Sequence, residues 1–251
     1  MKRKYGWKPQ GLDQRDRLYS MVARTPIKLP HSVDLRPKLP GCWDQGQLGS
    51  CTAHGIAGAL VYDEKIQKET FVMPSRLFIY YGERAMEGTI PQDAGANIRD
   101  GIKFVNSQGF PDEKLWPYDI KKFTVEPPQS VYDAARKHYA LQYEALDNRD
   151  IIELKECLAR GLPFVFGFSV FSEFESEEMA TTGVLNLPRH NEKPLGGHCV
   201  LCAGYDDVSS RFTVRNSWGA DWGKSGYFTM PYAYMTNVQF AEDFWAIQKI
   251  S

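Results

Sequence analysis

One cysteine in this 251-residue chain lies where its sulfur could act as a nucleophile. Cys51 follows a glycine-rich turn and stands at the predicted start of a helix, where free backbone N–H groups and the positive end of the helix dipole lie. Both favour the thiolate, which is the nucleophilic form of cysteine. Gln45, six residues earlier, carries an amide that could donate a hydrogen bond to an oxyanion beside that sulfur. This stretch therefore predicts nucleophilic catalysis, provided that the chain also supplies a base.

A histidine far along the chain is the strongest candidate for that base. His198 follows two glycines and opens a predicted strand, residues 199–205, so its ring can project from the mouth of the strand. Asn216 ends the next predicted strand, residues 211–215, and the turn between the two strands is short. Because their open ends meet, Asn216 could accept a hydrogen bond from the His198 ring and fix its tautomer and orientation.

Each candidate also has a less specific interpretation. Free cysteines are often buried for packing alone, and Cys51 taken by itself fits that interpretation. His54, three residues after Cys51 on the same predicted helix, is a competing base, but it points alongside the sulfur rather than across a cleft. Trp218 and Trp222 follow Asn216 and could shield its hydrogen bond from water. The set as a whole favours catalysis over a structural thiol.

Taken in chain order, these residues resemble the papain-like cysteine peptidases. His198 and Asn216 follow Cys51 by 147 and 165 residues. The interval in that family is about 130–150 residues, so the second lies slightly outside it. The matching segments are Gln45 before Cys51, Gly197-His198, Asn216-Ser217-Trp218-Gly219, Trp222-Gly223 and Gly226-Tyr227, and Val33-Asp34-Leu35-Arg36 is similar to the start of a mature enzyme. The resemblance runs from about Pro30 to the C-terminus.

The resemblance implies an α+β, two-lobed fold with a helical N-terminal lobe, an antiparallel β-barrel-like C-terminal lobe and the active site in the cleft between them. It implies that Cys51 and His198 form a thiolate–imidazolium pair that hydrolyses peptide bonds through a thioester acyl-enzyme. Asn216 would orient His198, while the Gln45 amide and the Cys51 backbone N–H would stabilise the oxyanion. The residues expected to contact the substrate are Gly49, Gly95, Trp218 and Glu242.

The sequence says less about substrate preference. Gly95 stands in a loop that resembles the glycine-containing loop with which the family pairs the substrate backbone. Glu242 or Asp243, just before residues 244–247, could reach the floor of the specificity pocket, where an acid would tolerate basic side chains. A solvated charge at the start of a strand is the simpler explanation for either acid.

Three features depart from the family pattern. Leu48 stands where the family usually has a cysteine, so the disulfide that such a cysteine would anchor is absent. Thr52 stands where a tryptophan usually follows the nucleophile. Only about thirty residues precede the body, in place of the long helical propeptide of the secreted enzymes. These departures fit an intracellular, signal-less branch of the family.

The elements that must position the candidate residues divide the chain into two halves. Apolar residues at helical spacing predict helices near residues 51–65, 74–87 and 97–108, with proline opening the second and Gly109 ending the third. The later half is predicted to contain strands near residues 139–143, 163–170, 198–205, 211–216, 226–230 and 245–249 and one helix from Asn148 to Gly161. We therefore expect a peptidase domain over 31–251, with a helical lobe over about 45–125 and a β-rich lobe over about 126–251.

Charge is unevenly distributed along the chain. The net charge of −1 gives no global signal for nucleic acid or membrane binding, and we expect neither. Residues 1–30 carry eight Lys or Arg and two Asp, a net of +6, which leaves −7 for the rest. Trp7 and Tyr19 are bulky anchors in this basic leader. We expect residues 5–28 to lie across the cleft as an intramolecular inhibitory segment, as in a zymogen. The alternative is a solvated arm without effect on the rate.

The remaining signals narrow the class of protein. Five cysteines, an odd number, and no visible secretory signal favour reduced thiols and a cytoplasmic protein, or one exported by a signal-independent route. Cys199 and Cys202 form a C-x-x-C pair, but their spacing sends the side chains to opposite faces of a strand, so we expect no metal and no cofactor. The expected partner is a peptide or protein substrate, bound by a monomer. Two other functions stay open: a papain-like acyltransferase or isopeptidase, and a catalytically silent papain fold that binds a partner.

Overall fold

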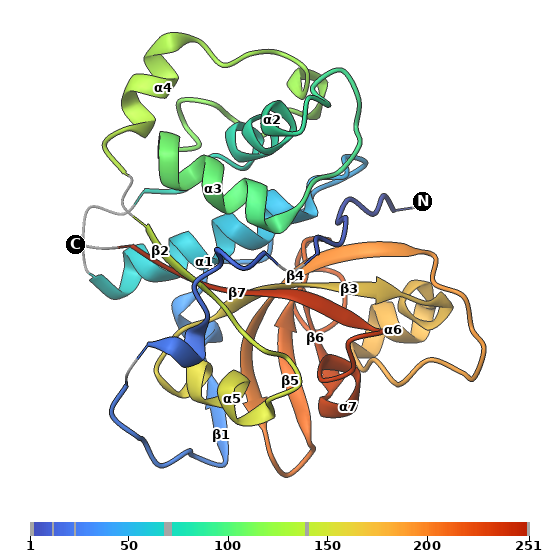
Figure 1. Cartoon of the computed structure of the whole chain (residues 1–251). Coiled ribbons are helices and arrows are strands. Elements are labelled where there is room, and N and C mark those ends of the chain that lie inside the picture. Colours follow the sequence, from blue (N-terminus) through green and yellow to red (C-terminus); the bar gives the residue numbers. More distant parts are fainter. Residues whose placement is uncertain (1–2, 12, 23, 68–71, 139–140, 250–251) are drawn as a thin grey trace.

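The computed structural model describes residues 3–11, 13–22, 24–67, 72–138 and 141–249. The helices within residues 76–135 gather on one side of the molecule. A twisted sheet and the helices within residues 151–235 lie on the other side, with the long helix α1 (Cys51–Gln67) between the two parts (Figure 1). The N-terminal segment, drawn in dark blue, runs along the boundary between these two parts (Figure 1). A mainly helical part and a sheet part are both present, as the predicted fold class requires. The helix over residues 129–135 lies with the helical part, although the β-rich lobe is predicted to begin at about residue 126 (Figure 1).

The helices differ in length and in how well the sequence predicts them. They are α1, α2 (Arg76–Met86), α3 (Ile98–Gln108), α4 (Gln129–Ala135), α5 (Ile151–Ala159), α6 (Glu177–Thr182) and α7 (Tyr232–Met235), with 3-10 turns η1 (Tyr19–Met21), η2 (Arg36–Lys38), η3 (Ile120–Lys122) and η4 (Ser172–Glu175). The sequence gives no signal for α4, α6 and α7, because each is too short to show a periodic apolar face.

The predicted helix boundaries hold at the start of α1 and at the end of α3, whereas α2 begins later than predicted. α1 begins at Cys51 as predicted. α2 begins after the predicted Pro74, because the Ser75 side chain accepts the Phe78 N–H and acts as N-cap. Gly109, with φ of 75°, ends α3 as predicted.

The helix predicted from Asn148 begins later than expected. α5 starts at Ile151, because the Asp150 carboxylate accepts two of the free N–H groups of its first turn. Asn148 instead donates to the backbone oxygens of Met235 and Ala241, at 2.9 and 3.0 Å. It therefore ties the start of α5 to the C-terminal part of the chain rather than capping the helix.

The strands form one antiparallel sheet in the order β2–β7–β3–β4–β5–β6, with β1 added beside β4. Their bounds are β1 (Ser32–Asp34), β2 (Leu141–Ala145), β3 (Phe164–Val170), β4 (Gly196–Asp206), β5 (Arg211–Arg215), β6 (Tyr227–Pro231) and β7 (Ala241–Lys249). The predicted strands are present with small shifts, although Tyr139 lies outside the described residues. The sheet stays open, since β2 and β6 form its two edges, so the β-barrel-like lobe expected from the sequence is corrected to an open sheet.

Helix α1 joins the two lobes. It packs on β4 and β7 on one side and on α2 and α3 on the other. The apolar residues that predict it, including Ile56, Leu60 and Val61, are buried. The helix that carries Cys51 at its N-terminus is therefore held by the cores of both lobes.

The described part of the chain contains no disulfide, no metal-binding group of side chains and no membrane-spanning helix. All five cysteines are free thiols there. No group of His, Cys, Asp or Glu side chains among the described residues is arranged to hold a metal ion. No helix within the same ranges has the length and apolar character needed to cross a membrane.

Candidate active site

Cys51, the first residue of α1, is completely buried. Its sulfur lies within reach of the backbone N–H groups of Cys199, Gly6 and Thr52. Cys199 directly follows His198 on β4, so the helix and the strand bring the predicted nucleophile and base to the same place. Gly6 belongs to the N-terminal segment, which therefore reaches the sulfur itself.

Gln45 is fixed in the turn before α1 by contacts to the opposite lobe. Its Oε1 accepts a hydrogen bond from Ser217 Oγ at 2.6 Å, and its backbone N–H donates to the Ser217 carbonyl at 2.8 Å. Its Nε2 donates to the carbonyl oxygens of Leu48 at 2.8 Å and Lys4 at 3.3 Å. The amide therefore directs an N–H at a peptide carbonyl of the N-terminal segment, close to Cys51.

His198 and Asn216 meet at the ends of β4 and β5. The two atoms His198 Nε2 and Asn216 Oδ1 are 2.8 Å apart. Because an amide oxygen only accepts, Nε2 carries the proton and Nδ1 has the free lone pair. Nδ1 is buried and has no hydrogen-bond partner among the described residues. This tautomer leaves a basic nitrogen available, as the sequence analysis expects.

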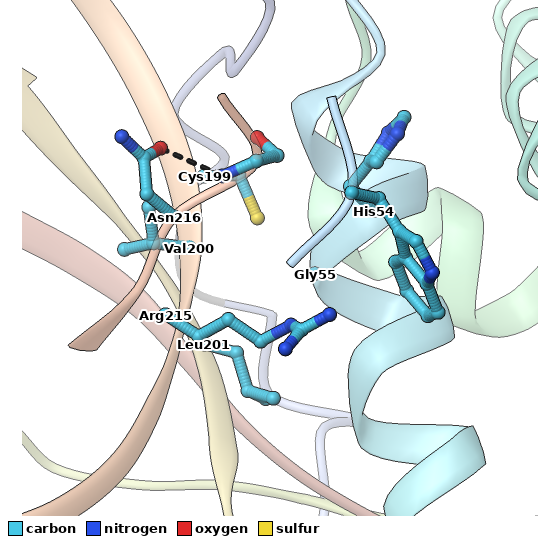
Figure 2. Close-up of a pocket in the computed structure, with 9 residues that line it drawn as sticks. His54, Gly55, Cys199, Val200, Leu201, Arg215 and Asn216 are labelled. Carbon is cyan, nitrogen blue, oxygen red and sulfur yellow. Dashed lines mark hydrogen bonds between the residues drawn. The ribbon is translucent and has the colours of Figure 1, made fainter. Parts of the chain in front are cut away.

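Figure 2 shows the space between α1 and β4 beside this pair. A small pocket there is lined by His54 and Gly55 of α1, Cys199 of β4 and Asn216, among others. The dashed line marks the hydrogen bond that the Ser217 N–H donates to Asn216 Oδ1, at 2.8 Å. Asn216 Oδ1 therefore accepts two hydrogen bonds, which fixes the orientation of its side chain.

His54, the competing base, is engaged elsewhere. Its Nδ1 donates to the Ser50 carbonyl at 2.9 Å, and its ring packs edge-on against Tyr118 with centroids 5.0 Å apart. Burial lowers the pKa of His54 well below its usual range. In Figure 2 it lies on the α1 side of the pocket, opposite Asn216. These contacts fit a neutral structural histidine.

Aromatic rings cover the His198–Asn216 pair. The Trp218 ring lies 5.3 Å from the His198 ring, and Trp222 packs edge-on against Trp218 at 5.2 Å. Phe174, on η4, contacts Trp218 at 5.0 Å. The two tryptophans lie where the sequence analysis expects a shield. Phe174 was not identified from the sequence, since an isolated apolar residue carries no motif.

The N-terminal segment occupies the space between the lobes, beside Cys51. The Gly6 carbonyl accepts the Ala96 N–H at 2.7 Å, and the Lys8 N–H donates to the Ala96 carbonyl at 3.1 Å. From the other lobe, the Gly197 carbonyl accepts the Trp7 N–H at 3.0 Å. The segment thus forms backbone hydrogen bonds with both walls. Its partners are Ala96, which follows the predicted Gly95, and Gly197, which precedes His198.

The segment approaches the walls so closely that only glycine fits at the contact points. A Cβ on Gly6 would lie 1.8 Å from the Gly49 carbonyl oxygen, and one on Gly95 would lie 2.0 Å from the Gly6 oxygen. Gly95 also has φ of 68°, which a glycine adopts without strain. Gly49 and Gly95, two residues expected to contact substrate, therefore both contact the N-terminal segment.

The Trp7 side chain fills a pocket on the sheet side. Its ring covers Gly167 and Gly197. A Cβ added to Gly167 would lie 1.9 Å from the nearest ring atom, and one added to Gly197 would lie 2.7 Å from the ring atom nearest to it. Its Nε1 donates to Asp243 Oδ2 at 3.0 Å, and the Gln10 backbone N–H donates to the same oxygen at 3.0 Å. Asp243 is therefore the acid that faces this pocket.

From the sequence, Glu242 is the acid expected to contact the substrate, and Asp243 is the alternative. In the structure, Asp243 contacts Trp7. The register between β3 and β7 shifts beside these residues, and Asp243 has φ of 57°. Such a bulge redirects a side chain to the other face of the strand. Glu242 is exposed. No local sequence pattern marks the bulge, which depends on how β3 and β7 align.

Burial makes both catalytic candidates neutral in this closed arrangement. Desolvation raises the pKa of Cys51 to about 11, although nearby backbone N–H groups act in the opposite direction. Desolvation lowers the pKa of His198 to about 4, despite its hydrogen bond to Asn216. A thiol and a neutral imidazole are thus favoured here, not the thiolate–imidazolium pair expected from the sequence. The physical reason is that a buried site penalises charge.

Comparison with known proteins gives a consistent result. Residues 29–246 match the profile described as papain family cysteine protease. A protein of Acanthamoeba polyphaga mimivirus, described as an uncharacterized peptidase C1-like protein, is 39% identical and covers 99% of this chain and 88% of its own length. The crystal structure of xylellain, a cysteine protease from Xylella fastidiosa, is 41% identical with a TM-score of 0.89 over 98% of this chain and 96% of that one. Digestive procathepsin L 3 of Tenebrio molitor larval midgut, 19% identical, shares the fold with a TM-score of 0.70 over 94% of this chain and 74% of that one.

Proposed function

We propose that this chain, which belongs to the papain family of cysteine proteases, hydrolyses peptide bonds with Cys51, His198 and Asn216 as its catalytic triad. The observation that carries the assignment is the 2.8 Å bond from His198 Nε2 to Asn216 Oδ1. It leaves His198 Nδ1 with a free lone pair beside the helix that carries Cys51. A positioned imidazole next to a cysteine at a helix N-terminus is the arrangement that activates a thiol.

In the proposed reaction, His198 Nδ1 takes the proton from the Cys51 thiol, and the thiolate attacks the carbonyl carbon of a peptide bond. The oxyanion receives hydrogen bonds from Gln45 Nε2 and the Cys51 backbone N–H. His198 then gives its proton to the departing amine, which leaves a thioester on Cys51. His198 activates a water molecule that hydrolyses the thioester, and the free thiol is restored.

The closed structure supports the role proposed for Gln45. Its Nε2 already donates to a peptide carbonyl, that of Lys4, at 3.3 Å. Its other amide atom is held by Ser217, so the N–H direction is set before a substrate arrives. A donor fixed in advance stabilises developing charge without having to reorganise.

The same proposal assigns residues 3–10, called the cleft segment below, the role of an intramolecular inhibitor. Three observations support it: the backbone pairing of the segment with both walls, the Gly6 N–H beside the Cys51 sulfur, and the complete burial of His198. A substrate backbone cannot reach Gly95 or Gln45 while this segment is present. Because the segment also keeps the site dry, its departure is expected to return the pKa values of Cys51 and His198 toward their ordinary ones.

Replacement of Cys51 and Gln45 tests the triad and its oxyanion donor. In a Trp7→Ala background, where the cleft segment loses its largest contact, Cys51→Ala should leave no measurable hydrolysis of a fluorogenic peptide. Gln45→Ala should lower kcat/KM by about 10²–10³-fold, since loss of one oxyanion donor costs about 2.7–4 kcal/mol in a comparable hydrolase.

Cys42→Ala is the matched control, because Cys42 is a half-buried free thiol that contacts Gly226 and Tyr227 rather than the site. It should retain the parent rate. Undiminished hydrolysis by the folded Cys51→Ala chain would rule out Cys51 as the nucleophile. A catalytically silent fold would also be excluded if Cys51→Ala abolishes both hydrolysis and the reaction of the chain with iodoacetamide.

A further inference from the structure

The cleft segment meets a carboxylate at almost every side chain that can donate a hydrogen bond. Arg3 pairs with Asp44 at 2.7 Å, and Lys4 pairs with Asp93 at 2.7 Å. Lys8 pairs with Glu87 at 3.0 Å. These three cations lie on both sides of Gly6, the residue next to the Cys51 sulfur. The charge complementarity therefore extends along the cleft on both sides of the nucleophile.

The two aromatic side chains of the segment also donate hydrogen bonds to carboxylates. Tyr5 Oη donates to Glu175 at 2.6 Å, and Trp7 Nε1 donates to Asp243 at 3.0 Å. The Tyr5 ring also lies near His198 and Trp218, with centroids 6.0 and 6.2 Å apart. Five of the acids that contact the cleft segment are called the cleft carboxylates below: Asp44, Glu87, Asp93, Glu175 and Asp243.

The cleft carboxylates come from separate parts of the fold. Asp44 precedes α1, Glu87 caps the C-terminus of α2, Asp93 lies between α2 and α3, Glu175 ends η4, and Asp243 lies in β7. Both lobes thus contribute acids to one channel. No single helix or continuous stretch of the sequence contains these acids, so only folding brings them to the cleft.

The cleft segment supplies the cations for this channel. Among the described residues, the ion pairs formed by Asp44, Asp93 and Glu87 are all with the cleft segment. When the segment leaves, these three carboxylates lose the cations that pair with them in this structure. The unpaired carboxylates then favour a ligand that brings cations back and disfavour one that brings further acids.

We propose that the open cleft selects extended peptide segments that carry lysine or arginine on both sides of the cleaved bond. The inference rests on the proposed function, because it takes the cleft segment as a guide to how a substrate binds. It extends that function by naming the substrate class. Each exposed ion pair contributes little, about 0.2–1 kcal/mol. Three pairs acting together correspond to about a tenfold preference.

A binding measurement tests the proposal without hydrolysis. The protein is the full-length chain with Trp7→Ala, which loosens the cleft segment, and Cys51→Ala, which prevents turnover. Two fluorescent octapeptides share one sequence with a central tryptophan, and differ only in flanking residues, which are lysines in one and glutamines in the other. We expect the lysine peptide to bind about tenfold more tightly at low salt. The ratio should fall toward one at about 0.5 M NaCl, where screening is strong.

Asp44→Asn with Glu87→Gln tests whether these carboxylates cause the preference. Each amide keeps an acceptor oxygen for the backbone N–H that the acid now accepts, from Gly46 and Asn97 respectively. The double change should remove most of the difference between the two peptides. The matched control is Glu126→Gln with Asp133→Asn, which removes two exposed charges from the segment around α4 and should preserve the difference.

The outcomes separate this inference from the proposed function. Equal affinity for the two peptides, or a tenfold ratio that the Asp44→Asn/Glu87→Gln chain retains, would overturn the substrate class. Hydrolysis by the chain carrying Trp7→Ala alone tests the function. Cleavage of both peptides at equal rates overturns only the inference. A charge-dependent affinity without any cleavage overturns only the function.

Discussion

Two parts of the N-terminal segment attach to the body by different physical means. The cleft segment is held by main-chain pairing and by cations that stay largely in solvent, with 53% of the Lys4 side chain and 39% of the Lys8 side chain exposed. The part that follows, residues 13–22 and 24–25, is called the anchor segment. Its Tyr19 is only 3% exposed and its Asp16–Arg99 pair, at 2.6 Å, is buried on both sides.

The anchor segment also joins the sheet lobe through its backbone. Leu18 forms a bridge with Ala145 of β2, and the Arg17 carbonyl accepts the Ala145 N–H at 2.8 Å. Arg24 pairs with the buried Glu144, and its guanidinium lies 3.7 Å from the centre of the Tyr19 ring. These contacts lie on the β2 edge, not beside Cys51.

The contrast indicates that the residues that attach the N-terminal segment most firmly differ from those of the cleft segment, for which inhibition is proposed. Exposed ion pairs stabilise weakly, whereas a buried aromatic ring contributes several times more. Within the cleft segment only Trp7 is a buried anchor of that kind. We therefore expect the cleft segment to leave the site while the anchor segment stays docked, so that inhibition is reversible without cleavage of the chain.

The largest expected effect is on the anchor side. Tyr19→Ala should lower the free energy of unfolding by about 3 kcal/mol, since it empties a buried aromatic site. Urea unfolding measures this change. Tyr19→Phe keeps the ring and is expected to cost less than about 1 kcal/mol. A negligible loss in Tyr19→Ala would contradict the assignment of Tyr19 as an integral part of the core.

The second effect is on the cleft side. Trp7→Ala should raise peptide hydrolysis about tenfold, which corresponds to about 1.4 kcal/mol of weakened docking, and should change the unfolding midpoint less than Tyr19→Ala does. Trp116→Ala is the control, because Trp116 is half-buried and contacts Lys122 rather than the cleft. An unchanged rate in the folded Trp7→Ala chain would show that the cleft segment does not restrain the enzyme.

The smallest effect is a pH dependence with two opposing contributions. In the closed state burial holds the pKa of His198 at about 4, below its ordinary 6.5, so protonation favours opening as pH falls from about 6.5 toward 4. Burial raises the pKa of Asp243 from 3.8 to about 6, so protonation of that carboxyl favours closure as pH falls below about 6. The two groups oppose each other between about pH 6 and 4.

Asp243→Asn removes the contribution that favours closure and keeps an acceptor for Trp7 and Gln10. The measured quantity is the hydrolysis rate divided by that of the same chain carrying Trp7→Ala, which cancels the pH dependence of the chemistry. This ratio should rise more steeply on acidification in Asp243→Asn than in the parent. A shallower rise would reverse the sign assigned to Asp243.

The sequence predicts where Cys51, His198 and Asn216 lie better than it predicts the geometry of the cleft. Cys51 is found because a helix start and an apolar face are local patterns, and α1 begins at that residue. His198 and Asn216 are found because a short turn must bring the ends of two successive strands together, and the structure joins them at 2.8 Å. Asp243 is not selected over Glu242, because the bulge that turns it inward depends on the alignment of β3 with β7.

By itself, the sequence determined which residue types were available and in what local setting: a cysteine at a helix start, a histidine at a strand mouth and a basic leader with two aromatic anchors. Only the tertiary structure decided the rest. It placed Gly6 against Gly49 and Gly95, gathered carboxylates from both lobes around Arg3, Lys4 and Lys8, and buried Cys51 and His198 in neutral form. The physical reason is range: caps and turns act over a few residues, whereas desolvation and charge complementarity depend on which distant segments the fold packs together.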